Sequence, residues 1–319
     1  MAEIFRGYLI FIWFSKVFYG SYVATGAVWC YHACFGYKSR QGLERYNMSQ
    51  QHAKKRYPTD VTDAEWSIIA PIVAQRPGRG RKRTVNIREV VNAIFYLNKT
   101  GCQWEMLPKD FPDYRHVNYY YLQWTRDGRW DLVEDLLRQV VRMAEGRDAE
   151  PTAAIMDSQS VKTTGKGEEH GYDPGKQVKG RKRHLLVDTL GLLMLVFVTR
   201  ASVQDRDGGA DICDAAQERF PKLKKIWADS AYRGELVEYV AQWCRFVLEI
   251  VTKPQGQRGF QVHPKRWIVE RTLGWLNLYR RLSKDYERRV ESSEAMIKIA
   301  SIRIMLRRLV SADNMQSNF

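Results

Sequence analysis

Two aspartates follow short apolar runs that have the length and composition of buried strands. Asp157 comes after residues 152–156, and Asp229 comes after Ile226-Trp-Ala; each is followed by a small polar stretch. In sheets with parallel strands, functional groups gather beyond the carboxyl ends of the strands, so we expect the two carboxylates to be neighbours. Neighbouring carboxylates repel each other unless a cation lies between them. Oxygen ligands of this kind favour Mg²⁺ or Mn²⁺ over zinc.

A third acid, Glu270, lies in an apolar-periodic segment that is predicted to be a helix over 264–282. Arg266 lies one helical turn before Glu270 and shares its face. Glu270 therefore has two interpretations: the third ligand of a metal site, or half of an ion pair worth about 0.2–0.5 kcal/mol. The order of the three acids, on two strands and a helix, favours Asp157, Asp229 and Glu270 as the catalytic and metal-binding residues.

The elements that must position these acids alternate in type. We predict strands at 152–157, 184–187, 192–198, 225–228 and 246–252, and helices at 208–220, 235–243, 264–282 and 296–310. The turn Asp188-Thr-Leu-Gly191 joins the second and third strands as a hairpin. A hairpin followed by alternating helices and strands predicts an α/β fold, with a mixed sheet flanked by helices.

The segment 58–145 is predicted to be mainly helical. Thr62-Asp-Ala-Glu65 is a capping-box pattern that opens a helix, and apolar residues with helical spacing follow in three further segments. The run Arg76-Pro-Gly-Arg-Gly-Arg-Lys-Arg83 is a basic loop that no core can bury. We expect a small helical, helix-turn-helix-like DNA-binding domain here; a helical bundle with a charged surface is the alternative.

Composition indicates an acidic partner and a reducing compartment. The 319 residues include 51 Lys and Arg against 36 Asp and Glu, a net charge of +15. Such an excess favours binding to nucleic acid or to a membrane surface. The five cysteines are odd in number and include no C-x-x-C pair, which argues against a disulfide scaffold and a structural zinc site.

Basic side chains near the acids and in the basic loop are candidates for DNA contact. They would hold phosphates and give affinity without sequence information, although a solvated charged surface is the alternative for any single one. The candidates are Arg79, Arg81, Lys82, Arg83, Lys179, Arg181, Lys182, Arg183, His184, Arg233, Arg266 and Arg271.

Four blocks of sequence resemble the DDE transposases of bacterial insertion sequences, in the group named after insertion sequence five. They are Asp157-Ser-Gln-Ser-Val-Lys-Thr163, Lys179-Gly-Arg-Lys-Arg-His184, Ala228-Asp-Ser-Ala-Tyr-Arg-Gly234 and Arg266-Trp-Ile-Val-Glu-Arg271. The segment 57–130 also resembles the N-terminal domain of these enzymes, so the resemblance spans about residues 57–310. It implies an RNase H-like catalytic fold in which Asp157, Asp229 and Glu270 hold Mg²⁺ or Mn²⁺, with two ions expected.

Two positions depart from the family signature around the third acid. The signature has Tyr three residues before the Arg and Lys seven residues after the Glu, whereas His263 and Asn277 stand there. These outer positions are thought to contact DNA near the reacting end. The departures therefore put the end contacts in doubt and leave metal binding intact.

The resemblance implies a DNA transposase. Metal-dependent cleavage at the ends of an insertion element would be followed by attack of the freed 3′-hydroxyl on target DNA. The implied partner is double-stranded DNA (terminal inverted repeats and target), bound by a homodimer or higher oligomer without a small-molecule cofactor. The expected location is the bacterial cytoplasm, at the nucleoid. The alternatives are a nuclease on the same fold that cuts without joining, and a DNA-binding remnant that has lost catalysis.

Residues 1–47 differ in composition from the rest of the chain. They hold 13 of the 39 aromatic residues and carry no formal charge over 17–35. We expect an upstream extension with Met48 as the true start; a membrane or interfacial segment and an ordered extra element are the alternatives. Removing its five basic and two acidic residues leaves a net charge of +12. The predicted domains are thus a leader at 1–47, the helical domain at 48–150, the catalytic domain at 151–312 and a tail at 313–319.

Overall fold

The computed structural model describes residues 57–75, 84–164, 169–251 and 265–316, with side chains as far as residue 310. These residues belong to one compact unit, Lys55–Phe319. The leader at 1–47 and the basic loop at 76–83 lie outside the described residues. None of the described helices has the length and apolar character that crossing a bilayer requires.

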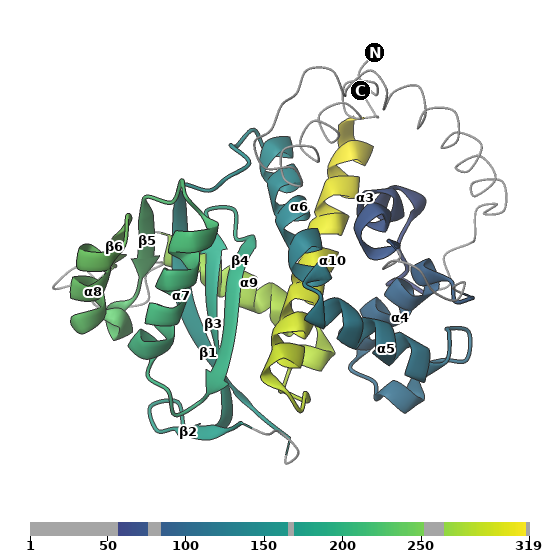
Figure 1. Ribbon diagram of the computed structural model, residues 1–319, viewed down its shortest axis with the longest axis horizontal. Helices are drawn as coiled ribbons and strands as arrows, with labels where there is room; N and C mark the ends of the chain where they lie inside the picture. The colour runs from purple at the N-terminus through teal and green to yellow at the C-terminus, as the bar shows by residue number, and fades with distance from the viewer. Residues whose placement is uncertain (1–56, 76–83, 165–168, 252–264, 317–319) are drawn as a thin grey trace. The chain divides into compact units, whose positions relative to one another are not determined.

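The segment predicted to be mainly helical contains four α-helices (Figure 1). They are α3 (Asp63–Val73), α4 (Ile87–Thr100), α5 (Tyr114–Arg126) and α6 (Arg129–Ala144), with the 3₁₀ helix η1 (Trp104–Met106) between α4 and α5. The predicted capping box is confirmed. The Glu65 N–H donates to Thr62 Oγ1 at 3.1 Å, and the Thr62 N–H donates to Glu65 Oε2 at 2.7 Å, so two otherwise unpaired N–H groups at the start of α3 are satisfied.

A six-stranded mixed sheet follows, and it confirms the predicted α/β class. Its strands are β1 (Ala153–Lys162), β2 (Gly171–Asp173), β3 (Val178–Asp188), β4 (Leu193–Arg200), β5 (Lys225–Ala228) and β6 (Val247–Ile250). The order is β2-β3-β1-β5-β6, with β4 also pairing with β3. β1 is antiparallel to β3 and parallel to β5, and β6 is parallel to β5.

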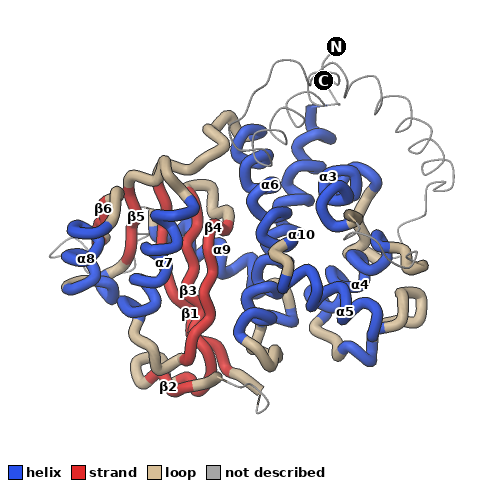
Figure 2. The backbone as a smooth tube through the Cα atoms, in the orientation of Figure 1, coloured by secondary structure: helices blue, strands red, loops and turns tan. Residues whose placement is uncertain are grey.

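One face of the sheet is covered by α7 (Asp205–Arg219) and α8 (Glu235–Trp243), as Figure 2 shows for α7. Ala154 and Met156 of β1 pack there against Ile212 and Ala216 of α7 in a shared apolar core. Because side chains alternate along a strand, Asp157 belongs to the opposite face. That face is contacted by α9 (Arg266–Asn277), which packs against β1 and β3.

The last helix, α10 (Val290–Gln316), connects the helical segment to the sheet. It packs against α6 and α4 on one side and against β4 on the other. Two hydrogen bonds fix this contact: Asn98 Nδ2 donates to the Met296 carbonyl at 2.9 Å, and the Tyr121 hydroxyl donates to the Ser292 carbonyl at 2.7 Å. The boundary predicted at residue 150 stays a prediction, but α10 belongs to the packing on both sides of it.

Several element bounds differ from those predicted. The strand at 225–228 and the helix at 235–243 are confirmed. β1 does not end at Asp157 but runs to Lys162, because β3 continues to pair with it over that length. The helix predicted over 264–282 ends at Asn277 and is followed by the 3₁₀ helix η3 (Arg280–Leu282), whereas α10 extends into the predicted tail.

Candidate active site

Asp157 lies on β1 at the point where the strand loses one neighbour. β5 pairs with β1 only over residues 153–155, whereas β3 pairs with it from Ala154 to Lys162. The Asp157 carboxylate therefore lies just beyond the end of β5. Its Oδ1 accepts a hydrogen bond from the Ser158 N–H at 2.7 Å, which fixes one of its two oxygens.

Asp229 is the first residue after β5 and caps the 3₁₀ helix η2 (Ser230–Tyr232). Its Oδ1 accepts the Ala231 N–H at 2.8 Å. Ile155 of β1 pairs with Trp227 of the parallel strand β5, so Asp157 and Asp229 each follow the same register pair by two residues. The predicted meeting of the two aspartates at one edge of the parallel strands agrees with this register.

The electrostatics of Asp157 show that the two carboxylates interact. Burial raises the pKa of Asp157 to about 6 and the negative charge of Asp229 adds to the rise, while the Ser158 N–H and the cations of Arg266 and Lys176 oppose it. Neighbouring like charges disfavour ionisation in this way. A carboxyl group whose pKa is raised by burial and by a second acid is a candidate functional group.

Glu270 lies on α9, which is fixed against the hairpin between β3 and β4. The buried Thr272 donates through Oγ1 to the Gly191 carbonyl at 2.8 Å. Gly191 has φ +79°, a left-handed conformation that glycine adopts without a Cβ clash, and its predicted hairpin turn is confirmed. The turn and Thr272 together set the position of α9, and Glu270 is exposed on that helix.

Arg266 links the second acid to the third. Its Nη2 lies 3.5 Å from Asp229 Oδ2, and its Nε lies 3.2 Å from Glu270 Oε1. The contact with Glu270 is the helical ion pair that the structural interpretation of Glu270 predicts. The same guanidinium also reaches Asp229 and opposes the rise in the pKa of Asp157, so its role extends beyond an ion pair on one helix. We call Asp157, Asp229, Glu270 and Arg266 the acidic cluster.

The donor chemistry of the acidic cluster suits a hard divalent cation. Asp157 and Asp229 supply the carboxylate oxygens that Mg²⁺ and Mn²⁺ prefer. Among the residues that the structure describes, no three His, Cys, Asp or Glu side chains converge on one point as metal ligands. The carboxylates of Asp157 and Asp229 fit such an ion by their chemistry, whereas the Glu270 carboxylate is paired with Arg266.

The two departures from the signature have different outcomes. Asn277 is the last residue of α9, and its Oδ1 lies 3.5 Å from the Gln159 side-chain nitrogen, two residues along β1 from Asp157. It therefore connects the end of α9 to β1. His263 lies outside the described residues.

The candidate DNA contacts separate into groups according to exposure. Lys179 on β3 and Arg233 after η2 are exposed, so both remain candidates. Arg271 is half-buried: its guanidinium stacks 4.6 Å from the ring centres of both Trp267 and Trp275 and donates to the Leu190 carbonyl at 3.0 Å. Its DNA contact stays a prediction. Four further candidates lie in the loop outside the described residues: Arg79, Arg81, Lys82 and Arg83.

Of the remaining five candidates, Arg266 belongs to the acidic cluster, and its DNA contact stays a prediction. The other four require a correction, because their side chains lie inside the protein. Arg181, Lys182, Arg183 and His184 are at most 5% exposed. Burial lowers the pKa of Arg183 to about 10, and it lowers the pKa of His184 to about 4, which leaves that imidazole neutral at pH 7. Buried side chains cannot reach a phosphate backbone, so these four are not DNA contacts in this structure.

Each of these buried groups has a partner within the fold. Arg181 Nη1 lies 3.2 Å from Asp285 Oδ2, and Lys182 Nζ lies 2.8 Å from Asp205 Oδ1. Arg183 donates to the Leu282 carbonyl at 2.9 Å, and His184 Nε2 lies 3.0 Å from the Thr199 hydroxyl. The basic run is therefore a set of internal bonds that tie β3 to the surrounding elements.

Two acids behind Asp157 escaped the sequence analysis. Ser158 donates to Asp205 Oδ1 at 2.8 Å, and Ser160 donates to Asp173 Oδ2 at 2.6 Å. These bonds hold β1 immediately after Asp157. The serines and acids are 47 and 13 residues apart in sequence, so no local pattern indicates the pairs.

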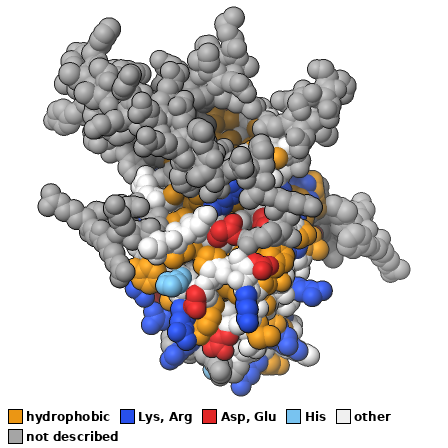
Figure 3. Space-filling view, turned by 90° about the vertical axis from the view of Figure 1, so that its right-hand side faces the viewer, with side chains coloured by type: hydrophobic (Ala, Val, Ile, Leu, Met, Phe, Trp, Pro, Cys, Tyr) orange, Lys and Arg blue, Asp and Glu red, His pale blue; other side chains and the backbone are white. Residues whose placement is uncertain are grey.

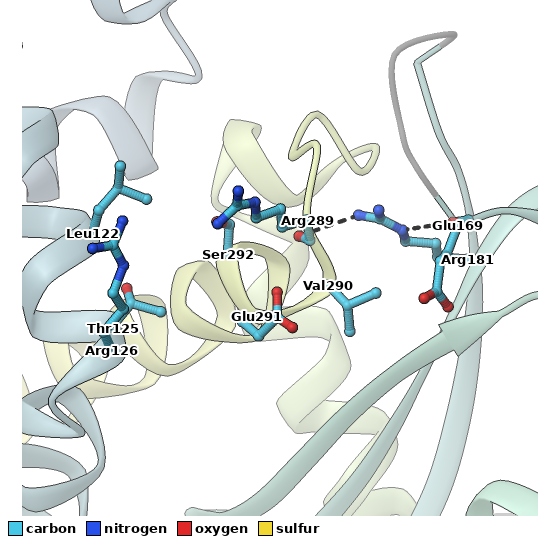
Figure 4. Close-up of a pocket in the computed structure, with 9 residues that line it drawn as sticks. All are labelled: Leu122, Thr125, Arg126, Glu169, Arg181, Arg289, Val290, Glu291 and Ser292. Carbon is cyan, nitrogen blue, oxygen red and sulfur yellow. Dashed lines mark hydrogen bonds between the residues drawn. The ribbon is translucent and has the colours of Figure 1, made fainter.

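A cavity of about 680 Å³ lies between α5, β3 and the start of α10 (Figure 4). Its wall includes Arg126, Arg181 and Arg289, but none of the three acids. Arg181 lies on one side of it and donates to the carbonyls of Glu169 at 2.8 Å and Arg289 at 3.5 Å. The cavity is thus separate from the acidic cluster, and its buried arginine serves to hold the chain before α10.

The described surface is mixed in charge on the face that Figure 3 presents. Lys and Arg side chains lie there among Asp, Glu and apolar side chains. The visible described residues of this face do not form a uniformly basic patch. Net charge alone therefore does not locate a DNA-binding surface on this face.

Two family models and a named relative match parts of this chain. A model described as the transposase DDE domain matches residues 148–305, and one described as a putative transposase of the IS4/5 family matches residues 61–134. A Burkholderia cepacia protein named as a putative transposase for insertion sequence element IS402 is 27% identical over 141 residues, 42% of this chain and 66% of that relative. The match thus spans just under two thirds of the relative's length.

All three acids lie within the matched DDE domain. This domain implies an RNase H-like fold, which agrees with the mixed sheet and its flanking helices. The first match covers the sheet with the acidic cluster, and the second covers α3 to α5 and the start of α6. The chain belongs to the DDE transposases of insertion sequences.

Proposed function

We propose that this protein cleaves DNA at the ends of an insertion element and joins the freed 3′-hydroxyl to target DNA. The acidic cluster carries the proposal. Asp157 within β1 and Asp229 just after β5 each follow the same pair of parallel residues by two positions, and Arg266 links Asp229 to Glu270 on the helix that packs against the same sheet. The match to the transposase DDE domain and the name of the Burkholderia cepacia relative support it.

Divalent ions, two in our proposal, would be held by Asp157, Asp229 and Glu270 and would supply the positive charge that phosphoryl transfer requires. Water attacks the phosphorus at the element end, and the bond to the 3′ oxygen breaks. The 3′-hydroxyl then attacks a phosphorus in the target and displaces another 3′ oxygen. No protein nucleophile is needed in either step. The buried bonds of Ser158 and Ser160 to Asp205 and Asp173 keep β1 rigid beside the reacting atoms.

The exposed cations Lys179 and Arg233 and the loop arginines and lysine at 79–83 would contact the phosphates of double-stranded DNA. Two element ends must meet in one reaction, so we infer a homodimer or higher oligomer on DNA. The site of action that follows is the bacterial nucleoid.

The decisive experiment is a cleavage and joining assay with the full chain, on DNA that carries the element's own ends and a target plasmid, with and without Mg²⁺ or Mn²⁺. We expect metal-dependent cut and joined products. Asp157→Asn and Asp229→Asn should each lower the rate by more than about 100-fold. About 100-fold is the upper range for changing a residue that only supports a metal ligand, and the loss of a ligand itself should cost more. Asp211→Asn, an exposed acid on α7, is the matched control and should stay within about twofold.

Each of the other possible results would support a different interpretation of the protein. Cutting without joining would reduce the activity to that of a nuclease. DNA binding without cutting by the unsubstituted protein would indicate a remnant without catalysis. Full-rate cutting by both aspartate variants would mean that the acidic cluster is not the active site.

A further inference from the structure

Arg266 occupies an unusual place for a basic side chain, because it lies against the carboxylates that would bind a cation. Its guanidinium contacts Asp229 Oδ2 at 3.5 Å and Glu270 Oε1 at 3.2 Å. The Arg266 side chain is 35% exposed, so water does not fully screen these contacts. Among the contacts described here, it is the cation that joins two of the three acids.

The residue before Arg266 fixes the start of α9 against strand β5. Lys265, the residue before it, has φ +76°, a left-handed conformation that is strained for a residue with a Cβ. Its ammonium lies 3.8 Å from the ring centre of Trp227 on β5, two residues before Asp229. This cation–π contact ties the start of α9 to the strand that delivers Asp229. The placement of Arg266 beside Asp229 is therefore built into the fold.

The charges of the acidic cluster do not balance without a further cation. In the described contacts the Arg266 guanidinium pairs with two of the three carboxylates, and Lys176, the other cation that acts on Asp157, bonds to Ser158. A divalent ion bound by Asp229 and Glu270 would use the carboxylate oxygens that Arg266 now contacts. Like charges at such separations repel strongly, so the guanidinium and the ion compete for one position.

We propose that Arg266 is a positioning residue that takes the place of the cation in the metal-free site, holding Asp229 and Glu270 together until a divalent ion displaces it. This inference rests on the proposed function, because it assumes that the acidic cluster binds metal. It also assigns Arg266 a role that DNA contact alone does not give it. The ion gains its ligands at the cost of an existing ion pair.

The test measures Mn²⁺ binding to the full chain in the absence of DNA, by isothermal titration calorimetry. Arg266→Ala should bind Mn²⁺ about tenfold more tightly than the unsubstituted protein, because the competing cation is gone. Its melting temperature without metal should fall, and saturating Mn²⁺ should restore it. Arg266→Lys, which reaches only one carboxylate at a time, should bind about two- to threefold more tightly.

Two controls separate this inference from its alternatives. Arg233→Ala removes an exposed cation four residues after Asp229 that contacts neither carboxylate in the described contacts, and it should change the Mn²⁺ affinity by less than about twofold. An equal change in Arg233→Ala and Arg266→Ala would indicate only a general loss of positive charge and would overturn the proposal. Asp229→Ala should abolish the Mn²⁺ signal.

Unchanged or weaker Mn²⁺ binding by Arg266→Ala overturns the proposal, since Arg266 would then be neutral or helpful to the ion. Should the alanine variant fail to fold, the lysine variant decides in the same way. If the unsubstituted protein and Asp229→Ala give the same titration, the metal site itself fails, and with it the proposed function. The two failures are thus distinguishable.

Discussion

The two faces of the sheet at β1 and its neighbour β3 carry charge in different ways. On the face that α7 covers, the buried Lys182 ammonium lies 2.8 Å from the Asp205 carboxylate and 3.5 Å from the Asp173 carboxylate, so a buried cation of the fold lies beside both acids. On the face that α9 covers, Asp157 and Asp229 are close enough for one to raise the pKa of the other. One face of the sheet thus has acids paired with a buried cation of the fold, and the other has two acids that repel each other.

This difference separates structural charges from functional ones. A buried ion is tolerated in a fold when partners of opposite charge surround it, as Asp205 and Asp173 surround Lys182. An excess of one sign is kept where a ligand is to supply the opposite charge. By this criterion the basic run at 181–184 is structural, and the acidic cluster has the charge pattern that the proposed function requires.

The largest expected effect comes from breaking a matched pair. Arg181→Met leaves Asp285 buried without its cation, and the loss of a buried partner costs about 3–5 kcal/mol. Urea unfolding of the full chain measures it. Lys179→Met, an exposed cation two residues earlier on β3, is the control and should change stability by less than about 0.5 kcal/mol.

The DNA affinity of the same two variants could contradict this interpretation of Arg181. A folded Arg181→Met protein of unchanged stability that loses DNA affinity would show that Arg181 faces the duplex. The conclusion that the basic run at 181–184 does not contact DNA would then be wrong.

Local patterns in the sequence predict those features that depend on nearby residues. The capping box of Thr62 and Glu65 lies within four residues, and the hairpin turn at Asp188–Gly191 within four. The proximity of the two aspartates could also be predicted, although β1 runs on past Asp157, because the parallel pairing of β1 and β5 brings both positions to the same level of the sheet. The prediction of the third acid rests on its helical position and on a resemblance to known enzymes.

The sequence could not indicate which side chains the fold would bury. Arg181 and its partner Asp285 are 104 residues apart, and β1 continues past Asp157 only because β3 pairs with it. A run of cations looks the same in sequence whether it faces solvent or an acid from a distant segment. Burial of charge is a property of tertiary pairing, which local spacing does not encode.

A buried acid outside the site tests the rule that unmatched charge marks function. Glu134 on α6 is 2% exposed, and the nearby cations Arg138 and Lys298 are paired with Asp135 and Asp131. Burial, with smaller contributions from these two aspartates, raises the pKa of Glu134 to about 8, so it is largely neutral at pH 7. The rule survives here because Glu134 carries little charge under these conditions.

This raised pKa makes stability depend on pH. The folded state holds the Glu134 proton up to about pH 8, whereas the unfolded chain loses it near pH 4.5. Stability should therefore fall as pH rises between these values, by at most about 1.4 kcal/mol per pH unit from this residue. Urea unfolding at pH 7 and pH 8.5 should show the fall, and Glu134→Gln should remove most of it.

Glu294 on α10 provides the control. Burial raises its pKa to about 7, so its contribution is lost mainly below pH 7. Glu294→Gln should flatten the profile between pH 5 and 7 and leave the fall above pH 7 in place. A profile that keeps its full slope above pH 7 in Glu134→Gln would mean that Glu134 is already ionised, and the rule would then have an exception.

The smallest expected effect has the opposite sign and bears directly on the acidic face. Asp157→Asn removes one of the two like charges while its side-chain oxygen still accepts the Ser158 N–H. The metal-free protein should gain about 0.5–2 kcal/mol, the usual range for a stabilising change, and lose cleavage. Urea unfolding at pH 7.5 with a chelator measures the gain, with Asp211→Asn as the matched control. The same change of acid to amide at Asp205 would remove the nearer of the two carboxylates that pair with the buried Lys182 and would destabilise the protein, so the two aspartates should move stability in opposite directions. Equal losses of stability in Asp157→Asn and Asp205→Asn would mean that Asp157 is a structural charge like Asp205. The contrast between the two faces of the sheet would then carry no information about function.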